Sequence, residues 1–174
     1  ILKVTSKCAF GKLLEIIESA NCRVEPKCSV YSKCGGCQIQ HIDYDNQLLL
    51  KEENIKRCFQ KVAGIDVTVL PTIKSPNEFG YRNKLQLPVA ETKFGTEIGF
   101  YAENSHRVVP ITDCVINAEW TQDIIRAFKK YIEEFNIQGY DEQNNSGELR
   151  EITVKEVKGS LIITAVVLDR KIRG

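Results

Sequence analysis

The chain has 174 residues and almost balanced charge, with 24 Lys and Arg against 23 Asp and Glu, so its formal net charge is +1. With 43% hydrophobic and 27% charged residues it has the composition of a folded globular protein, which excludes a disordered tail, a collagen or a low-complexity scaffold. The longest apolar run, Leu161 to Leu168, is interrupted by Thr164 and is far shorter than the ~20 residues that a membrane span needs. The first 20 residues lack the layout of a signal peptide. We therefore expect a soluble, cytoplasmic monomer without membrane contact.

The cysteine and methionine counts are unusual: there are seven Cys and no Met. An odd number of cysteines cannot all pair within one chain, and without a signal peptide we expect ligands, core residues or redox groups before disulfides. Because the chain starts at Ile1 and not at Met, we expect it to be a piece of a longer protein.

The N-terminal quarter has little periodicity. Lys12 to Ile17 is predicted to be the end of a strand whose partners lie upstream. Residues 19–42 contain Pro26, Gly35 and Gly36 and follow no period, which predicts a long loop. Loops of that length without regular structure are usually functional.

A first helix is predicted over about Tyr44 to Val62. Asp43 is a suitable N-cap and Gly64 a suitable stop. One stripe of this helix is apolar, and its members are Leu48, Ile55, Phe59 and Val62. We expect Cys58, beside that stripe, to be a small core residue.

Strands and a second helix follow. The predicted strands are Val67 to Ile73, Tyr81 to Val89, a hairpin of Thr96 to Ala102 with His106 to Ile111, and a hairpin of Leu149 to Val157 with Leu161 to Leu168. The second helix is predicted between an Asn117 cap and Gly139, with a core-facing stripe of Trp120, Ile124, Phe128, Ile132 and Phe135. The order lacks long βαβ alternation, so we predict an α+β fold with a mainly antiparallel sheet, two principal helices and an N-terminal cysteine-rich metal-binding loop.

Three cysteines stand in the loop as C-x5-C-x2-C, at Cys28, Cys34 and Cys37, with two glycines in the last step. Small residues there let backbone N–H groups approach a metal-bound sulfur, and a closed site needs a fourth ligand. The candidates are Cys8, Cys22, Cys58, Cys114, His41 and His106. We favour Cys114, because a ligand at the end of a strand would tie the loop to the sheet, although spacing alone does not select it.

Four cysteine ligands of a metal are the preferred interpretation of this pattern. A thioredoxin-like pair is less favoured, because the C-G-G-C step does not open a helix after a strand. Inert core thiols fit least, because the loop is rich in glycine. The spacing leaves zinc and iron–sulfur both open, since each accepts four thiolates.

These residues carry a resemblance to a known family. The cysteine motif followed by Gln38-Ile39-Gln40-His41 resembles the RNA (uracil-5-)-methyltransferase family, in particular the branch that modifies 23S ribosomal RNA and carries a 4Fe-4S cluster. Further matching segments are Tyr44 with Gln47 and Lys51, Gly80-Tyr81-Arg82-Asn83-Lys84, Gly99-Phe100-Tyr101, Ser105-His106, Asp113-Cys114 and Gly147-Glu148-Leu149-Arg150. The chain departs from the family at Glu151, where His is usual.

The resemblance implies that Cys28, Cys34, Cys37 and Cys114 are the cluster ligands. It implies that residues 1–18 are the last strand of a small RNA-binding β-barrel (a TRAM domain) and that residues 19–174 are the central iron–sulfur domain. The catalytic domain, which uses S-adenosylmethionine, would follow outside this sequence. The 174 residues contain no glycine-rich cofactor motif, so we expect no catalytic residue and no methyl transfer from this fragment alone.

RNA, most simply 23S ribosomal RNA, is the implied partner, and rRNA processing the implied role. Candidate contacts are Arg82, Lys84 and Gln86 on one strand face, Phe100 as a stacking surface, and His106, which would bind RNA or cap a turn. One of Phe100 and Tyr101 should point into the core, and His41 should anchor the loop as a hydrogen-bond donor. The alternatives are a tRNA uracil-5-methyltransferase, a small iron–sulfur redox protein and a zinc-stapled interaction module.

Overall fold

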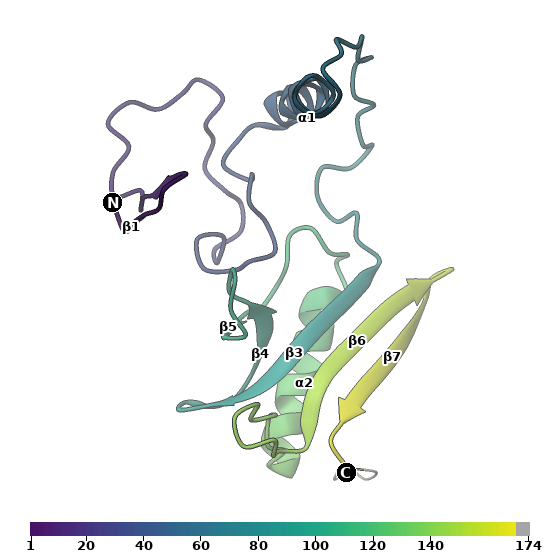
Figure 1. Cartoon of the computed structure of the whole chain (residues 1–174). Helices are drawn as coiled ribbons and strands as arrows, with labels where there is room; N and C mark the ends of the chain where they lie inside the picture. The colour runs from purple at the N-terminus through teal and green to yellow at the C-terminus, as the bar shows by residue number, and fades with distance from the viewer. Residues whose placement is uncertain (170–174) are drawn as a thin grey trace.

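The centre of the molecule is a five-stranded sheet in a computed structural model that describes residues 1–169. The strands are β3 (Lys84–Thr92), β4 (Gly95–Tyr101), β5 (Val108–Pro110), β6 (Leu149–Val157) and β7 (Ser160–Val167). They lie in the order β5-β4-β3-β6-β7, and every neighbouring pair is antiparallel. One helix, α2 (Thr121–Phe135), lies behind the sheet in Figure 1. The predicted α+β fold with a mainly antiparallel sheet is confirmed.

The core forms between α2 and the inward face of the central strands. Leu85, Leu87 and Val89 alternate along β3 and are at most 2% exposed, as the period of a half-buried strand requires. They belong to one buried cluster with Ile125 and Ile132 of α2. Full burial of each such side chain stabilises the fold by about 1.5–3 kcal/mol. The predicted strand at Tyr81 begins only at Lys84, and Tyr81 itself is 54% exposed.

The start of α2 differs from the prediction. Asn117 does not cap the helix, which begins at Thr121 after Trp120 and has no side-chain cap. Asn117 is instead buried in the preceding turn, 5% exposed, where its side chain contacts a cysteine. The apolar stripe is also turned slightly, so that Ile125 is the most buried apolar residue of the helix and Ile124 is only partly buried.

Two tight turns follow the prediction closely. β6 and β7 are joined by Lys158 and Gly159, both with positive φ (50° and 78°), the geometry of a two-residue turn that matches strand twist. Asn104, at φ 52°, lies in the turn between β4 and β5. β5 has only three residues and is shorter than the predicted strand from His106 to Ile111.

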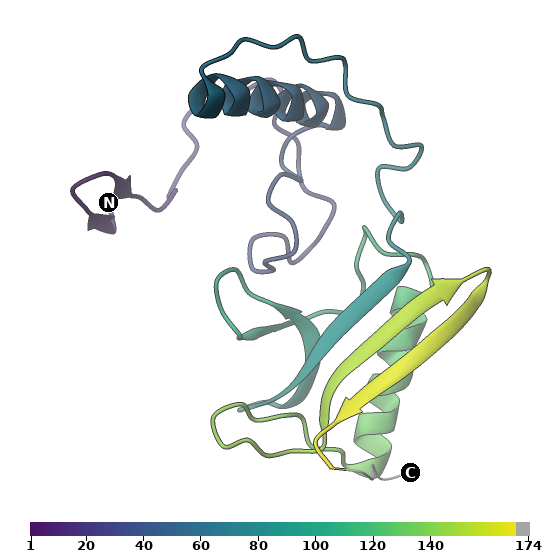
Figure 2. The same cartoon turned by 45° about the vertical axis from the view of Figure 1, so that its right-hand side comes forward.

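The first helix, α1 (Tyr44–Cys58), lies away from the sheet (Figure 2). Asp43 caps it as predicted, because its Oδ1 accepts from the N–H of Asn46 at 2.9 Å. A π-helical turn, η1 (Phe59–Ala63), continues it to Gly64, which ends the helix at φ 67°. Its apolar stripe is mostly exposed, with only Leu48 buried, and the predicted core position of Cys58 is wrong because that thiol is exposed.

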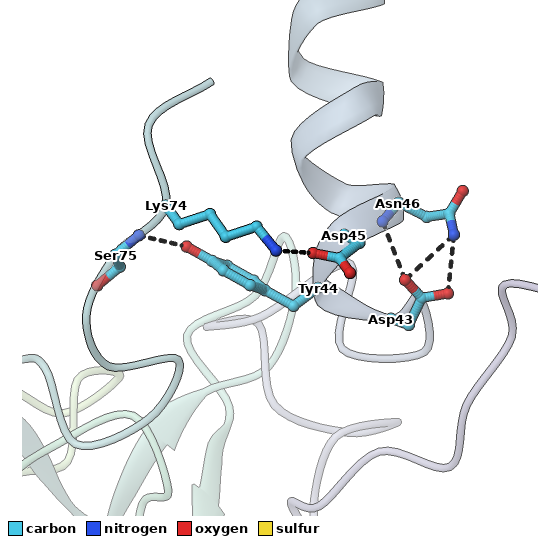
Figure 3. A network of polar contacts seen from close by, with 6 residues as sticks. All are labelled: Asp43, Tyr44, Asp45, Asn46, Lys74 and Ser75. Atoms are coloured by element: carbon cyan, nitrogen blue, oxygen red, sulfur yellow. Dashed lines mark hydrogen bonds and ion pairs between the residues drawn. The ribbon is translucent and has the colours of Figure 1, made fainter. Parts of the chain in front are cut away.

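The chain returns along α1 without forming the predicted strand from Val67 to Ile73. β-branched residues favour a strand only where another strand accepts their hydrogen bonds. Here a side chain of α1 takes that place, because the N–H of Thr72 donates to a carboxylate oxygen of Glu52 at 2.6 Å. Just after the segment, the N–H of Ser75 donates to the hydroxyl of Tyr44 at 2.8 Å, and Lys74 pairs with Asp45 (Figure 3).

The N-terminal residues form a separate, exposed hairpin of β1 (Lys3–Val4) and β2 (Ala9–Phe10). The predicted strand from Lys12 to Ile17 is absent from the described residues, and every residue from 1 to 20 is exposed. Without a partner strand, this segment has no acceptor for a ladder of hydrogen bonds. Within residues 1–169, no helix is long and apolar enough to cross a membrane.

Candidate metal centre and nucleic-acid surface

Residues 19–42 form the predicted loop, and a tyrosine ties its two halves together. The hydroxyl of Tyr31 lies 2.5 Å from the backbone oxygen of Gln38 and 2.6 Å from Nδ1 of His41. The carbonyl can only accept, and the hydroxyl has one proton, so the hydroxyl donates to Gln38 and accepts from Nδ1–H of His41. His41 thus anchors the loop as a donor, as the sequence suggested.

The two glycines of the loop allow two close approaches. The N–H of Gly36 donates to Sγ of Cys34 at 3.3 Å, the contact that small residues were expected to allow. The N–H of Gly35 donates to the backbone oxygen of Tyr101 at 2.9 Å, and a Cβ at Gly35 would lie 2.9 Å from the backbone nitrogen of Glu103. The loop therefore sits directly on the turn between β4 and β5.

This seating brings four cysteines to one small cavity of about 80 Å³. Cys28, Cys34 and Cys37 line it from the loop, and Cys114 lines it from the segment after β5. The other fourth-ligand candidates, Cys8, Cys22, Cys58, His41 and His106, do not line it. The position favoured for the fourth cysteine is thus the one that the fold places beside the other three.

Burial raises the pKa of the Cys28 and Cys34 thiols, and negatively charged neighbours raise it further. For Cys28 these neighbours are Cys114, Cys37 and Asp113; backbone N–H groups oppose the effect at both sulfurs. A cavity that gathers several thiols, with little contact with water, disfavours their ionised form. The same donor set is the one that Zn²⁺ or an iron–sulfur cluster takes.

Within residues 1–169, no group of three or more His, Cys, Asp or Glu side chains is arranged so that it could hold a metal ion as it stands. The four cysteines are neighbours around one cavity.

The sequence reasoning missed a contact between Asn117 and the candidate ligand Cys114. The Nδ2 of Asn117 donates to Sγ of Cys114 at 3.2 Å, while the Oδ1 of Asn117 is buried without a hydrogen-bond partner among the described residues. A polar side chain three residues after a candidate ligand was the available signal, but the same position also suits a helix cap.

Four of the five candidate RNA contacts lie together. Arg82, Lys84, Gln86 and Phe100 line a groove of about 410 Å³ at the start of β3, together with Tyr81, Asn83, Leu85 and Asn117. Arg82 and Lys84 are exposed, and no hydrogen bond or ion pair of their side chains is found within residues 1–169. This groove is called the Arg82 groove below.

Two of the candidate contacts, Gln86 and Phe100, have partners within the fold. Nε2 of Gln86 donates to Glu151 at 2.9 Å. Phe100 is partly buried and packs against the core, so of Phe100 and Tyr101 it is Tyr101, 46% exposed, that faces outward.

His106 lies outside the Arg82 groove. Its Nδ1 is 2.8 Å from a carboxylate oxygen of Glu142, and its ring stacks on Tyr101 with 5.3 Å between centroids. His106 therefore does not cap a turn; it is held by an acidic and an aromatic partner.

Comparison with known proteins gives relatives along nearly the whole chain. No protein-family model matches. A protein named "Uncharacterized RNA methyltransferase" from Clostridium tetani is 42% identical over 174 residues, which are 99% of this chain and 38% of that protein. One from Halalkalibacterium halodurans is 39% identical over 171 residues, 98% of this chain and 37% of that protein. The chain thus spans less than two fifths of the length of these relatives.

A solved structure is also similar. The crystal structure of Pyrococcus abyssi tRNA (uracil-54, C5)-methyltransferase with S-adenosyl-L-homocysteine matches 88% of this chain and 34% of that chain, with a TM-score of 0.65 and 27% sequence identity. The chain is therefore related, over nearly its whole length, to one part of proteins named RNA methyltransferases.

Proposed function

We propose that this chain is the iron–sulfur RNA-recognition part of an S-adenosylmethionine-dependent 23S ribosomal RNA (uracil-5-)-methyltransferase. The observation that carries the proposal is the cavity shared by Cys28, Cys34, Cys37 and Cys114. The similarity to RNA methyltransferases supports the enzyme class, and the likeness to a uracil-C5 methyltransferase supports the position that is methylated.

The donor set of four cysteines accepts either a 4Fe-4S cluster or a single zinc ion, and the proposal takes the cluster because the cysteine motif resembles that of the cluster-bearing branch. Tetrahedral zinc with Zn–S bonds of about 2.3 Å needs four sulfurs within about 3.8 Å of one another. A cluster binds each thiolate through a different iron and so accepts sulfurs that are farther apart. The four cysteines around the cavity supply the donors for either group, and measuring the iron, sulfide and zinc content separates the two.

A cluster held by four cysteines has no open iron position, so its role here is to tie the loop to the sheet. In the proposed whole enzyme, a cysteine thiolate adds to C6 of uracil, C5 attacks the methyl group of S-adenosylmethionine, and a base removes the C5 proton before the cysteine leaves. Those groups would lie outside this sequence. The target base has to leave its stack, and this part would hold the RNA while it does so.

The Arg82 groove is the proposed RNA surface. Arg82 and Lys84 are its basic members, and a cation that meets a phosphate contributes about one unit to the salt dependence of binding. Arg82→Ala and Lys84→Ala should each weaken binding of a uridine-containing RNA stem-loop and lower the salt slope by about one. Lys130→Ala, on the exposed side of α2, is the matched control. Variants of Arg82 and Lys84 that bind like the parent would exclude this groove as the RNA surface.

A tRNA target is the second candidate, favoured by the likeness to the Pyrococcus abyssi enzyme. Mapping 5-methyluridine in a strain that lacks the gene separates the two. The 23S proposal predicts loss of the ribosomal mark with the tRNA mark intact. Loss of the tRNA mark with intact ribosomal RNA would reject it.

A further inference from the structure

The cysteine cavity and the Arg82 groove share a wall. Arg82, Phe100 and Asn117 line both of them. Of these three, Asn117 is the one whose side chain bonds to a cysteine of the cavity, with Nδ2 3.2 Å from Sγ of Cys114. A change in the charge or ligation of the Cys114 sulfur can therefore act on the Arg82 groove through the side chain of Asn117.

Backbone hydrogen bonds extend this link to Arg82. The N–H of Arg82 donates to the oxygen of Ile116 at 3.0 Å, and the N–H of Ala118 donates back to the oxygen of Arg82 at 3.1 Å. These two bonds flank Asn117, whose own N–H donates to the oxygen of Cys114 at 3.0 Å. Arg82 is thus held by the same turn that presents Cys114 and Asn117.

We propose that Asn117 is a positioning residue that couples the state of the Cys114 sulfur to the geometry of the Arg82 groove; this rests on the proposed function, which places an iron–sulfur cluster at Cys114. An N–H donates more strongly to a metal-bound thiolate than to a neutral thiol, since hydrogen bonds to charged acceptors are the stronger ones. Cluster binding therefore fixes the Asn117 amide, and the fixed amide holds the turn against which Arg82 is bonded. Because Asn117 is 5% exposed, it has little room to take another orientation.

This coupling predicts that the RNA affinity of the chain depends on iron. A cluster that stabilises the groove should raise RNA affinity, and the gain should depend on Asn117. We expect the full chain, purified without oxygen, to bind a uridine-containing RNA stem-loop about tenfold more tightly with iron than after removal of iron by a chelator. Asn117→Ala should abolish most of that gain. Asn117→Asp, which keeps the size of the side chain but lacks the N–H donor, should do the same and serves as the second variant if the Ala variant is poorly folded.

Asn83→Ala is the matched control. Asn83 is an exposed amide that lines the same groove but not the cavity, so this variant should keep the gain on iron loading even if its affinity falls. A merely structural role of Asn117 would lower the affinity of the iron-loaded and iron-free chains equally.

Each outcome decides the question. An equal gain in the parent and in both Asn117 variants would overturn the inference, as would an iron-loaded parent whose RNA affinity does not change on removal of iron. A parent that binds no iron would instead reject the proposed cluster, and the inference would fall with it. A gain that is present in the parent and in Asn83→Ala and lost in both Asn117 variants is the result we expect.

Discussion

Gly99 lies where β4 and β5 approach most closely, and its replacement should separate the two strands. A Cβ at this position would lie 1.9 Å from the backbone oxygen of Val109 and 2.6 Å from its carbonyl carbon. An ordinary contact starts at 3.4 Å, so Gly99→Ala requires the backbones to move apart by about 1.5 Å (3.4 minus 1.9). Both clashing atoms are backbone, so no side chain can yield.

The cost follows from what this pairing holds. The N–H of Ala102 donates to Arg107 at 2.9 Å and the N–H of Ile111 to Ile98 at 3.2 Å, and a shift of that size breaks both hydrogen bonds, each worth about 1 kcal/mol. Val109 and Ile111 are both 3% exposed and would lose part of their burial. We expect a loss of about 3–5 kcal/mol in the free energy of unfolding, and a melting temperature lower by about 10 °C.

Thermal unfolding followed by circular dichroism measures this effect. Gly11→Ala is the control, because a Cβ there meets nothing within 4 Å, and its melting temperature should match the parent. Because β5 leads directly to Ile111 and Cys114, Gly99→Ala should also bind less iron. A Gly99→Ala chain that melts within 2 °C of the parent, by the conversion used above, would refute the reasoning.

Three further predictions concern the cysteine loop. In the iron-free chain, Cys28 and Cys34 should need a higher pH for alkylation than a free thiol with the ordinary pKa of 9.0, because burial raises the pKa of both thiols. Profiles of alkylation rate against pH, followed by mass spectrometry, that match the profile of the free thiol would contradict this. A raised pKa means that the folded chain favours the protonated thiols more than the unfolded chain does. This contribution to stability is complete below the ordinary pKa of 9.0 and is lost as the pH rises through the pKa of the folded chain. Chemical unfolding of the iron-free chain should therefore show a loss of stability above about pH 9. Tyr31→Phe removes the hydroxyl that joins Gln38 to His41 and should destabilise the loop by about 1–2 kcal/mol. Limited proteolysis within residues 19–42 should then be faster than in the parent. A cleavage rate like that of the parent would show that the hydroxyl does not hold the loop.

The elements that the sequence predicted well are those whose signals are local. β3 alternates between buried and exposed residues, Asp43 caps α1, and the turn at Lys158 and Gly159 joins two strands. Each signal depends on residues a few positions apart, so it does not depend on the rest of the fold.

The errors arose where a distant partner decides the structure. Val67 to Ile73 has β-forming residues, but the neighbour available to it is a helix, so no strand forms. Asn117 suits a helix cap, yet a cysteine sulfur takes its side chain. The apolar stripe of α1 has the period of a packed helix, while Ile55 and Phe59 are each 45% exposed. A periodicity shows that a face is apolar and does not show what covers it.

The candidate site likewise contains residues that local spacing marks and residues that only the fold brings to it. The spacing of Cys28, Cys34 and Cys37 marks three members, because they lie within one loop. Cys114 could be favoured only by its position at the end of a strand, since the fold alone brings it to the loop. Phe100 and Tyr101 are adjacent, and the pairing register of β4 decides which of them packs against the core.

The most direct test of this account is the iron, sulfide and zinc content of the chain purified without oxygen, measured together with its visible spectrum, for the parent and for Cys114→Ala. We predict about four iron and four sulfide per chain in the parent, with the broad visible absorption of an iron–sulfur cluster, and loss of both in the variant. One zinc and no iron would contradict the cluster, and a parent without any metal would contradict the metal centre altogether.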